Sequence, residues 1–292
     1  MQKISFTKMN GAGNDFIIFD KNLYQNLVLS KDLIKGLSDR HYGIGADGII
    51  TISGSSEYDF EMEYFNADGS TGSLCGNGAR CAVSYAGEIF SLKKKVRFLS
   101  NGEEYSGEIL SSNNIRFYFN QPNNLKMNFK VKASGQLINA DYIDTGSPHV
   151  VIDIKEILKY PGKPASGYSE LNEVPVFEIG REIRFLPEFK PGGTNVNFIN
   201  VKNGMLEIRT YERGVENETL SCGTGSAAAA LVSCFKKKLN PPVVLSTRGG
   251  DELIVDFKFE DEKVKELSLT GPVITSFTGE FLLNKYLKTS GA

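Results

Sequence analysis

Hydrophobic and polar residues alternate over many short stretches of the chain, which is the pattern of half-buried β-strands. Turn-forming residues such as Gly, Asn and Asp separate most of these stretches. In the first half the strand-like segments are 3–9, 14–20, 48–53, 60–66, 95–100 and 114–119. In the second half they are 150–154, 182–186, 196–201, 205–212, 243–247 and 252–257. The pattern predicts a protein built mainly from strands.

Two segments, at about 77–89 and about 224–237, have a helical pattern instead, and each half of the chain contains one of them. Both are rich in small apolar residues on all sides. A helix of this kind tolerates close contact all round, so we expect each one to lie inside a curved sheet.

The order of segments repeats between the two halves. The strand at 60–66 leads through a polar loop into Cys75 and the first helix, and the strand at 205–212 leads in the same way into Cys222 and the second. Segment 11–20 also resembles 145–154, since each is a small polar turn followed by an apolar strand that includes an aspartate. Two matches in one order indicate a duplicated unit. A boundary is expected at the Asn-rich segment 119–128.

Composition narrows the class of protein. The chain has 292 residues, of which 40% are hydrophobic and 23% charged, as in folded globular proteins. The net charge of −2 gives no basic surface for nucleic acid or an anionic membrane. No apolar run approaches the ~20 residues that span a bilayer, and the N-terminal segment lacks the apolar stretch of a secretory signal. We therefore expect a cytoplasmic protein with reduced thiols.

The four cysteines form no C-x-x-C pair, and the chain has only two histidines, so we expect no structural zinc. Cys81 and Cys234 lie within the apolar helical patterns, where a buried, inert thiol is the usual outcome. Cys75 and Cys222 differ, because each opens a Cys-Gly-x-Gly turn directly before a helix.

These turns suggest a chemistry. Backbone N–H groups at a helix start attract anions and favour a thiolate over a thiol. Two such turns, facing each other across a cleft, would hold a carboxylate, and two thiols beside the neighbouring carbon would invert its configuration by proton transfer. The alternatives are an incidental cysteine in a glycine turn, or a Cys75–Cys222 disulfide, which a cytoplasmic protein would keep reduced.

Seven sequence blocks, in order, resemble the diaminopimelate epimerases and together cover nearly the whole chain. They are "MNGAGNDF", "RHYGIGADG", "FNADGSTGSLCGNGAR", "TGSPHVV", "GTNVNF", "YERGVENETLSCGTG" and "LTGPV". The related proline racemases also use two cysteines, but the first and third blocks together are more similar to diaminopimelate epimerase. The phenazine-biosynthesis relatives share the fold without the cysteine pair.

The resemblance implies an α+β fold of two pseudo-symmetric domains, each a curved, mainly antiparallel sheet around a central helix. The first would comprise 1–121 with about 272–292 and carry Cys75; the second would comprise 122–271 and carry Cys222. The implied activity is the cofactor-independent interconversion of LL- and meso-2,6-diaminoheptanedioate, in lysine and cell-wall precursor biosynthesis. No metal or pyridoxal phosphate is expected.

By the same resemblance Cys75 and Cys222 are the two catalytic bases, and His149 and Glu212 tune their thiols. The matching substrate-binding positions are Asn14, Asn66, Gly76, Asn77, Asn195, Glu212, Arg213, Gly223 and Thr224. Asn, Glu and Arg suit a substrate with two ammonium and two carboxylate groups. His41 is expected to be structural.

Two positions depart from the pattern, because many family members have Gln where this chain has Gly48 and Asn where it has Ser147. Contacts to the distal end of the substrate are thus left open. Two alternatives also stay open: a proline racemase-like enzyme or another amino-acid epimerase, and a non-catalytic amino-acid-binding redox module, which would not need the substrate-side residues. The sequence does not define the oligomeric state, and a homodimer is one option.

Overall fold

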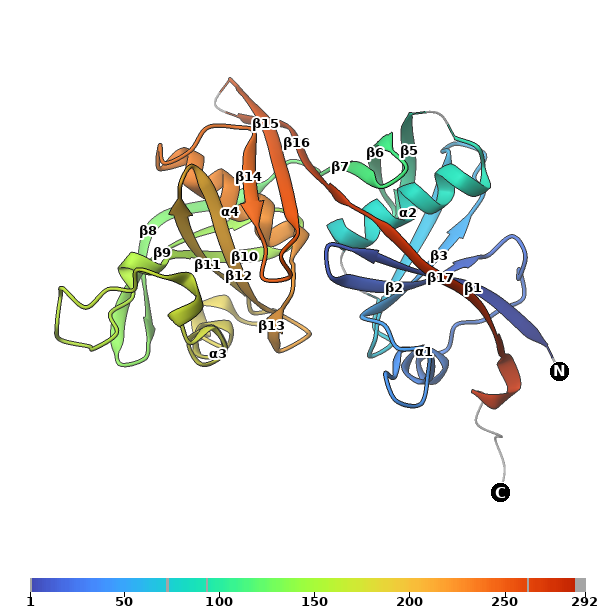
Figure 1. Ribbon diagram of the computed structural model, residues 1–292, viewed down its shortest axis with the longest axis horizontal. Coiled ribbons are helices and arrows are strands. Elements are labelled where there is room, and N and C mark those ends of the chain that lie inside the picture. The colour runs from blue at the N-terminus through green and yellow to red at the C-terminus, as the bar shows by residue number, and fades with distance from the viewer. Residues whose placement is uncertain (1, 72–73, 93, 262, 287–292) are drawn as a thin grey trace. The chain divides into compact units, whose positions relative to one another are not determined.

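The computed structural model describes residues 2–71, 74–92, 94–261 and 263–286, and it divides into two compact units. Unit 1 comprises 1–117 and 271–292, and unit 2 comprises 118–270. Residues 72–73, within the third sequence block, and the end of the segment 272–292 lie outside the described residues. Figure 1 shows the strands and helices of each unit. Within the described residues, no helix is both long and apolar enough to cross a bilayer.

Unit 1 is an extended run of strands with two α-helices. Its strands are β1 (Lys3–Gly11), β2 (Asn14–Asp20), β3 (Gly48–Ser53), β4 (Phe60–Asn66), β5 (Lys95–Ser100), β6 (Glu103–Ser111), most of β7 (Asn114–Tyr118) and β17 (Ile274–Leu282). Its helices are α1 (Lys31–Ser38), α2 (Gly76–Ile89) and the 3₁₀ turn η4 (Leu283–Lys285).

Unit 2 has the same kinds of element. Its strands are β8 (Asn123–Ala133), β9 (Gln136–Asp144), β10 (Pro148–Asp153), β11 (Asn195–Lys202), β12 (Met205–Glu212), β13 (Asn217–Thr219), β14 (Val243–Ser246), β15 (Glu252–Glu260) and most of β16 (Lys263–Pro272). Its helices are α3 (Val176–Arg184) and α4 (Gly223–Phe235), with 3₁₀ turns η1 (Ile154–Glu156), η2 (Leu171–Glu173) and η3 (Pro187–Phe189).

The strand pairings follow the same order in the two units. In unit 1, β17–β1 and β1–β2 are antiparallel, β2–β3 parallel, β3–β4 antiparallel, β4–β5 parallel and β5–β6 antiparallel. In unit 2, β8–β9 and β9–β10 are antiparallel, β10–β11 parallel, β11–β12 antiparallel, β12–β14 parallel and β14–β15 antiparallel. The repeated order predicted from the sequence is therefore present in the pairing itself.

Each long helix is surrounded by the strands of its own unit, as the sequence predicted (Figure 1). Helix α2 contacts β1, β2, β3, β4 and β6, and α4 contacts β9, β10, β11, β12, β14 and β15. The residues 227–230 of α4 are four alanines without exposed surface. Small side chains let the sheet approach the helix from several directions, which a large side chain at these positions would prevent.

The shorter helices α1 and α3 each pack on one side of a sheet over an apolar cluster. In unit 1 this cluster includes Leu33, Ile34 and Leu37 of α1. In unit 2 it includes Ile179 and Ile183 of α3. These helices connect β2 to β3 and β10 to β11, and such crossovers make the parallel pairs possible.

Parts of the sequence prediction were wrong. Segment 182–186 was predicted as a strand but lies mostly in α3, because the buried residues Val176, Ile179 and Ile183 follow a helical spacing that a five-residue window does not reveal. Helix α1 and strands β6, β9 and β16 were not predicted. The expected boundary segment 119–128 directly follows the division between the two units at 117/118, and strand β8 begins within it.

Candidate functional site

Cys75 is the N-cap residue of α2 and makes no side-chain cap hydrogen bond. Its carbonyl oxygen accepts the hydrogen bond from Ala79 N, at 2.7 Å, that starts the helix. The thiol is half-buried, and its sulfur lies 3.4 Å from the side-chain oxygen of Asn14. The sulfur therefore lies at the positive end of a helix, beside a carbonyl-type acceptor.

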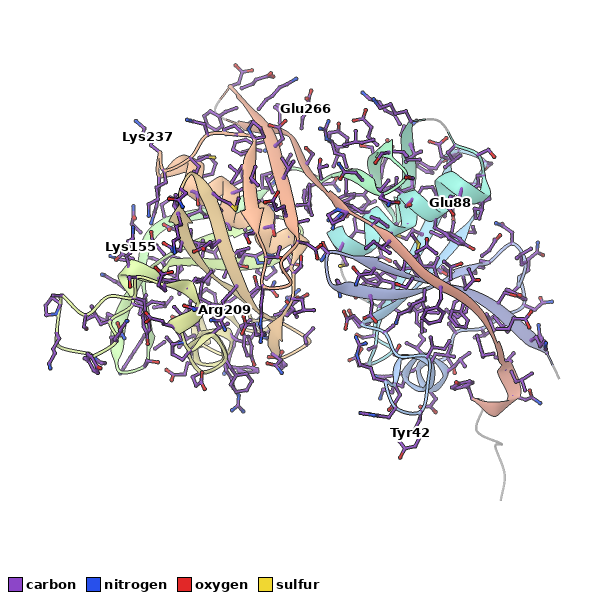
Figure 2. All side chains as sticks on the ribbon, viewed as in Figure 1. Tyr42, Glu88, Lys155, Arg209, Lys237 and Glu266 are labelled. Carbon is purple, nitrogen blue, oxygen red and sulfur yellow. The ribbon has the colours of Figure 1, made fainter. Side chains whose placement is uncertain are left out.

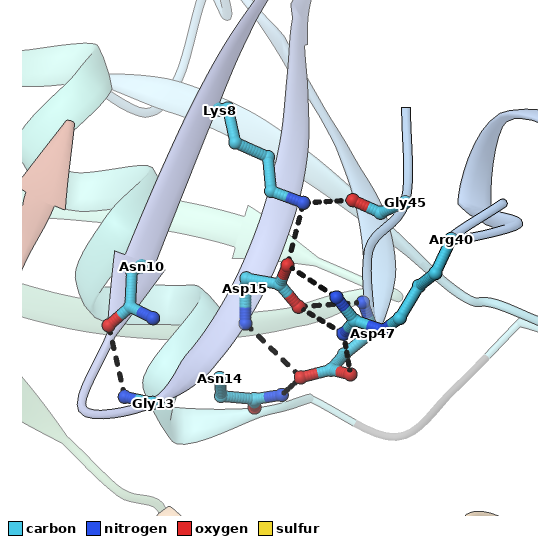
Figure 3. Close-up of polar contacts among 8 residues, drawn as sticks. All are labelled: Lys8, Asn10, Gly13, Asn14, Asp15, Arg40, Gly45 and Asp47. Carbon is cyan, nitrogen blue, oxygen red and sulfur yellow. Dashed lines mark hydrogen bonds and ion pairs between the residues drawn. The ribbon is translucent and has the colours of Figure 1, made fainter. Parts of the chain in front are cut away.

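Asn14 begins β2 and is fixed by an ion-pair network shown in Figure 3. Its amide nitrogen donates to Asp47 Oδ2 at 2.5 Å, an oxygen that also accepts from the Asp15 backbone N–H at 3.2 Å. Arg40 contacts the carboxylates of both Asp15 and Asp47 at 2.7 Å, and Lys8 Nζ lies 2.6 Å from Asp15. Because Asp47 takes the NH₂ group, the oxygen of Asn14 is left to face Cys75.

The two carboxyl groups of this network titrate differently. Burial opposes ionisation of Asp15, but hydrogen bonds from Arg40 and Lys8 outweigh it and lower its pKa to about 2. Burial and the charge of Asp15 raise the pKa of Asp47. Asp15 thus keeps its charge and holds Arg40 in place, and Arg40 in turn holds Asp47.

Other predicted substrate-binding residues of unit 1 lie at the end of β4 and in the first turn of α2. Asn66 ends β4 opposite Gly48, which begins β3 beside Phe16. The amide nitrogen of Asn66 donates to Ser70 Oγ at 3.0 Å. Asn77 is buried in the first turn of α2, next to Gly76 of the turn, and its side-chain oxygen accepts from Arg80 at 3.1 Å.

Cys222 occupies the equivalent place in unit 2, as the N-cap residue of α4. Its carbonyl oxygen accepts from the backbone N–H and the hydroxyl of Ser226, each at 2.9 Å. The sulfur lies 3.5 Å from the hydroxyl oxygen of Thr224, and the side chain is buried. Gly225 follows in the same turn, where an added Cβ would lie 2.4 Å from Asn197 Oδ1. Only glycine allows the helix start to approach the sheet this closely.

His149 lies behind this turn, on β10, without exposed surface. Its Nε2 is 2.9 Å from Thr224 Oγ1, and its Nδ1 is 3.1 Å from Asn197 Nδ2. Burial, helped by the positive charge of Arg213, lowers the pKa of His149 to about 3. The imidazole is therefore neutral near neutral pH. It can influence Cys222 through the hydrogen bonds of the Thr224 hydroxyl, which contacts both residues, and not through a positive charge.

The remaining predicted residues of unit 2 lie at the ends of neighbouring strands. Asn195 begins β11 beside His149, and its side chain accepts from Arg213 N at 2.8 Å and donates to Pro148 O at 3.0 Å. Glu212 ends β12 and accepts from Thr219 Oγ1 at 2.9 Å. Within the described part of the chain, the Arg213 guanidinium has no hydrogen bond or ion pair. A carboxylate ligand would suit it.

Packing explains one of the two departures from the family pattern. An added Cβ at Gly48 would lie 2.6 Å from the Tyr64 ring and 2.7 Å from Phe65 O, so this chain has no room for a side chain there. Ser147 is buried in the turn before β10. His41, by contrast, is exposed in a loop. Its neighbour Tyr42 is 90% exposed and points outward in Figure 2.

The structure adds residues that the sequence prediction did not single out. Among them are Asp47 and Arg40 behind Asn14, and Asn197 and Thr210 behind His149. Asn197 accepts from Thr210 Oγ1 at 3.0 Å while donating to His149 and Val150 O. In "GTNVNF", Asn195 and Asn197 are two residues apart and so lie on the same face of an otherwise apolar strand. Two amides in such a strand indicate a buried hydrogen-bond network. The described residues contain no group of three or more side chains suited to a metal ion.

The chain was compared with known proteins. The family model described as diaminopimelate epimerase matches residues 6–124 and 142–275. The diaminopimelate epimerase of Aquifex aeolicus is 37% identical over 94% of this chain and 97% of its own. That of Chlorobaculum tepidum is 36% identical over 94% of this chain and all of its own. The crystal structure of a Bacillus anthracis phenazine biosynthesis protein of the PhzF family superimposes with a TM-score of 0.70, at 14% identity, over 97% of this chain and all of the other.

The structural match defines a fold class, two units of curved sheet around a helix, that also occurs in proteins of distant sequence. Within that class, the family match and the identity levels are specific. The chain belongs to the diaminopimelate epimerase family, and it is an isomerase that acts on a small molecule.

Proposed function

We propose that the protein interconverts LL- and meso-2,6-diaminoheptanedioate without a cofactor, with Cys75 and Cys222 as its two proton-transfer groups. The observation that supports this most is the pair of N-cap cysteines at equivalent helix starts in two units of equal strand order. Family membership supports the substrate, which the names of the relatives contain.

In the proposed reaction one thiolate removes the proton from the α-carbon while the other thiol adds a proton to the opposite face. The first sulfur ends as a thiol and the second as a thiolate, so charge and protons balance. N–H groups at Gly76, Asn77, Gly223 and Thr224 would stabilise the negative charge that develops on the carboxylate. Asn14, Asn66, Asn195, Glu212 and Arg213 would bind the remaining amine and carboxylate groups.

The biological setting follows from the same proposal. Both epimers are amino acids of lysine and cell-wall precursor biosynthesis, and we place the enzyme in the cytoplasm, where its thiols stay reduced. The net charge of −2 supports the absence of a nucleic-acid partner.

The direct test is a stereochemical assay of the purified protein on LL-diaminoheptanedioate, with L-proline as the competing substrate. We expect the meso epimer to form, with full activity after chelator treatment. Cys75→Ser and Cys222→Ser should each lose at least ~10³-fold in kcat, because each removes one proton-transfer step. Cys234→Ser, the half-buried cysteine near the other end of α4, is the matched control and should stay active. Racemisation of proline alone, or full activity of either serine variant, would overturn the proposal.

A further inference from the structure

The two cysteines have matching positions, but within its own unit each sulfur contacts a different kind of hydrogen-bonding group. Cys75 lies beside an acceptor, the oxygen of Asn14, at 3.4 Å. Cys222 lies beside a hydroxyl, that of Thr224, at 3.5 Å. A hydroxyl either donates or accepts, so its direction depends on the groups behind it.

A chain of buried hydrogen bonds sets that direction in unit 2. Thr210 donates its hydroxyl proton to Asn197 Oδ1, so the other end of this amide is NH₂, which also donates to Val150 O at 2.9 Å. The same NH₂ donates to His149 Nδ1, which must then be the unprotonated nitrogen. The proton of the neutral ring consequently lies on Nε2.

His149 Nε2–H therefore donates to Thr224 Oγ1 at 2.9 Å. Among the described residues, the Thr224 hydroxyl has two partners, His149 and the Cys222 sulfur. Since the first is a donor, the hydroxyl proton of Thr224 is directed at the sulfur. A donor stabilises a thiolate more than a thiol.

The opposite holds in unit 1. A carboxylate oxygen of Asp47 accepts from the Asp15 backbone N–H, so it is an acceptor that requires the NH₂ end of Asn14. The oxygen of Asn14 can only accept, and it therefore stabilises the S–H form of Cys75.

We propose that Cys222 is the thiolate and Cys75 the thiol of the resting enzyme, with Thr210, Asn197, His149 and Thr224 as the chain that holds this asymmetry. The proposal rests on the proposed function for its catalytic meaning. The resting enzyme would accept the epimer whose proton Cys222 removes; Cys75 would give up its own proton and become the thiolate that acts on the other epimer.

Charged groups lie in both units. In unit 2, Glu212 ends β12 and Arg213 follows it, and the charge of Arg213 acts on His149. A carboxylate such as Glu212 opposes a thiolate and a guanidinium such as Arg213 favours it. In unit 1, Arg80 of α2 donates to Asn77, and each carboxylate of the network in Figure 3 contacts a cation. Both units thus contain charges of both signs, and the hydrogen bonds to the two sulfurs differ.

Thiolate absorbance near 240 nm, followed against pH, measures the two thiols separately. In Cys75→Ser the absorbance change measures the titration of Cys222, and in Cys222→Ser it measures that of Cys75. The double variant gives the background absorbance of the tyrosines, which is subtracted. Burial raises the pKa of Cys81 to about 12 and that of Cys234 to about 11, so neither titrates in the range of interest. Burial opposes ionisation of Cys222 more than that of the half-buried Cys75, but we expect the donated hydrogen bond to outweigh burial, so that the midpoint of Cys222 lies about one pH unit below that of Cys75.

Substitutions in the series of hydrogen bonds from Thr210 to Thr224 test the direction in which those bonds donate. Each substitution is made in the Cys75→Ser background. Thr224→Val should raise the Cys222 midpoint by about one pH unit, whereas Thr224→Ser, which keeps the hydroxyl, should leave it in place. Asn197→Asp places an acceptor beside His149 Nδ1, so that Nδ1 carries the proton and Nε2 accepts from the Thr224 hydroxyl. This variant should also raise the Cys222 midpoint. If Asn197→Asp does not fold, the Thr224 pair decides alone.

Equal midpoints, a lower midpoint for Cys75, or no response to Thr224→Val would overturn the inference. The titration uses no substrate. Its failure would thus leave measured epimerase activity intact, and a lack of epimerase activity would leave the midpoints intact.

Discussion

At the scale of single residues, the surroundings of the four cysteines separate two of them from the others. Burial raises the pKa of Cys81 to about 12 and that of Cys234 to about 11, which makes both poor thiolates near neutral pH. Cys75 and Cys222 instead cap helices, where N–H groups and the helix dipole favour negative charge. The distinction drawn from the glycine turns therefore has a physical basis in helix position.

His149 gives a residue-scale prediction about pH. Its pKa is about 3 in the folded state, because of burial, against about 6.5 when exposed. Between these values the unfolded chain binds a proton that the folded chain does not, so this contribution to stability is complete above pH 6.5 and is lost as pH falls. The expected loss between pH 7.5 and pH 5 is about 2 kcal/mol.

Urea unfolding of the wild type and of His149→Gln at both pH values checks this. The variant lowers the free energy of unfolding at pH 7.5 but should lack the histidine part of the pH dependence. An equal pH dependence in the two proteins would show that folding does not lower the pKa of His149.

At the scale of elements, the starts of α2 and α4 are held by close contact with the sheet. Gly225 has no space for a side chain, with Asn197 Oδ1 only 2.4 Å from the position of a Cβ. In unit 1, Gly11 similarly brings β1 close to α2, where a Cβ would lie 2.9 Å from Asn77 O. The glycines thus determine how near each cysteine turn lies to the strands that surround it.

Gly225→Ala should consequently lower the free energy of unfolding by about 1–3 kcal/mol, since either the helix start or Asn197 must move. It should also reduce activity, because Asn197 contacts His149. Gly54→Ala is the matched control: its nearest atom is 3.7 Å from the added Cβ, and little change is expected. Equal melting curves for the two variants would contradict the close contact.

The same scale shows what the sequence can and cannot predict. Strands β2, β3, β4 and β5 agree with their predicted bounds, because alternation and flanking turns mark them clearly. The network behind each cysteine was not predictable, since Asp47 and Asn14 are 33 residues apart and Asn197 and His149 are 48 apart. Such contacts depend on which strands pair, and one sequence does not contain that information.

At the scale of the whole molecule, the two units share one order of strand pairing. In each unit a cysteine is the N-cap residue of the helix that the strands surround. A duplicated unit gives two equivalent groups, as the proposed two-base inversion of a carbon centre requires. The hydrogen bonds behind the two cysteines have diverged, however: an amide oxygen serves one and a hydroxyl the other. Equivalent folds can thus support two different roles in one step.

The most direct test of the two-thiol account is the source of the proton in the product. In heavy water, LL-diaminoheptanedioate and the purified enzyme should give a meso product that carries deuterium at the inverted carbon, because the donating thiol was charged from solvent. Substrate recovered early should remain largely unlabelled, since reversal returns the original proton from the thiol that removed it. Early product that mostly keeps the original hydrogen would show a single base acting on both faces, and would contradict the account.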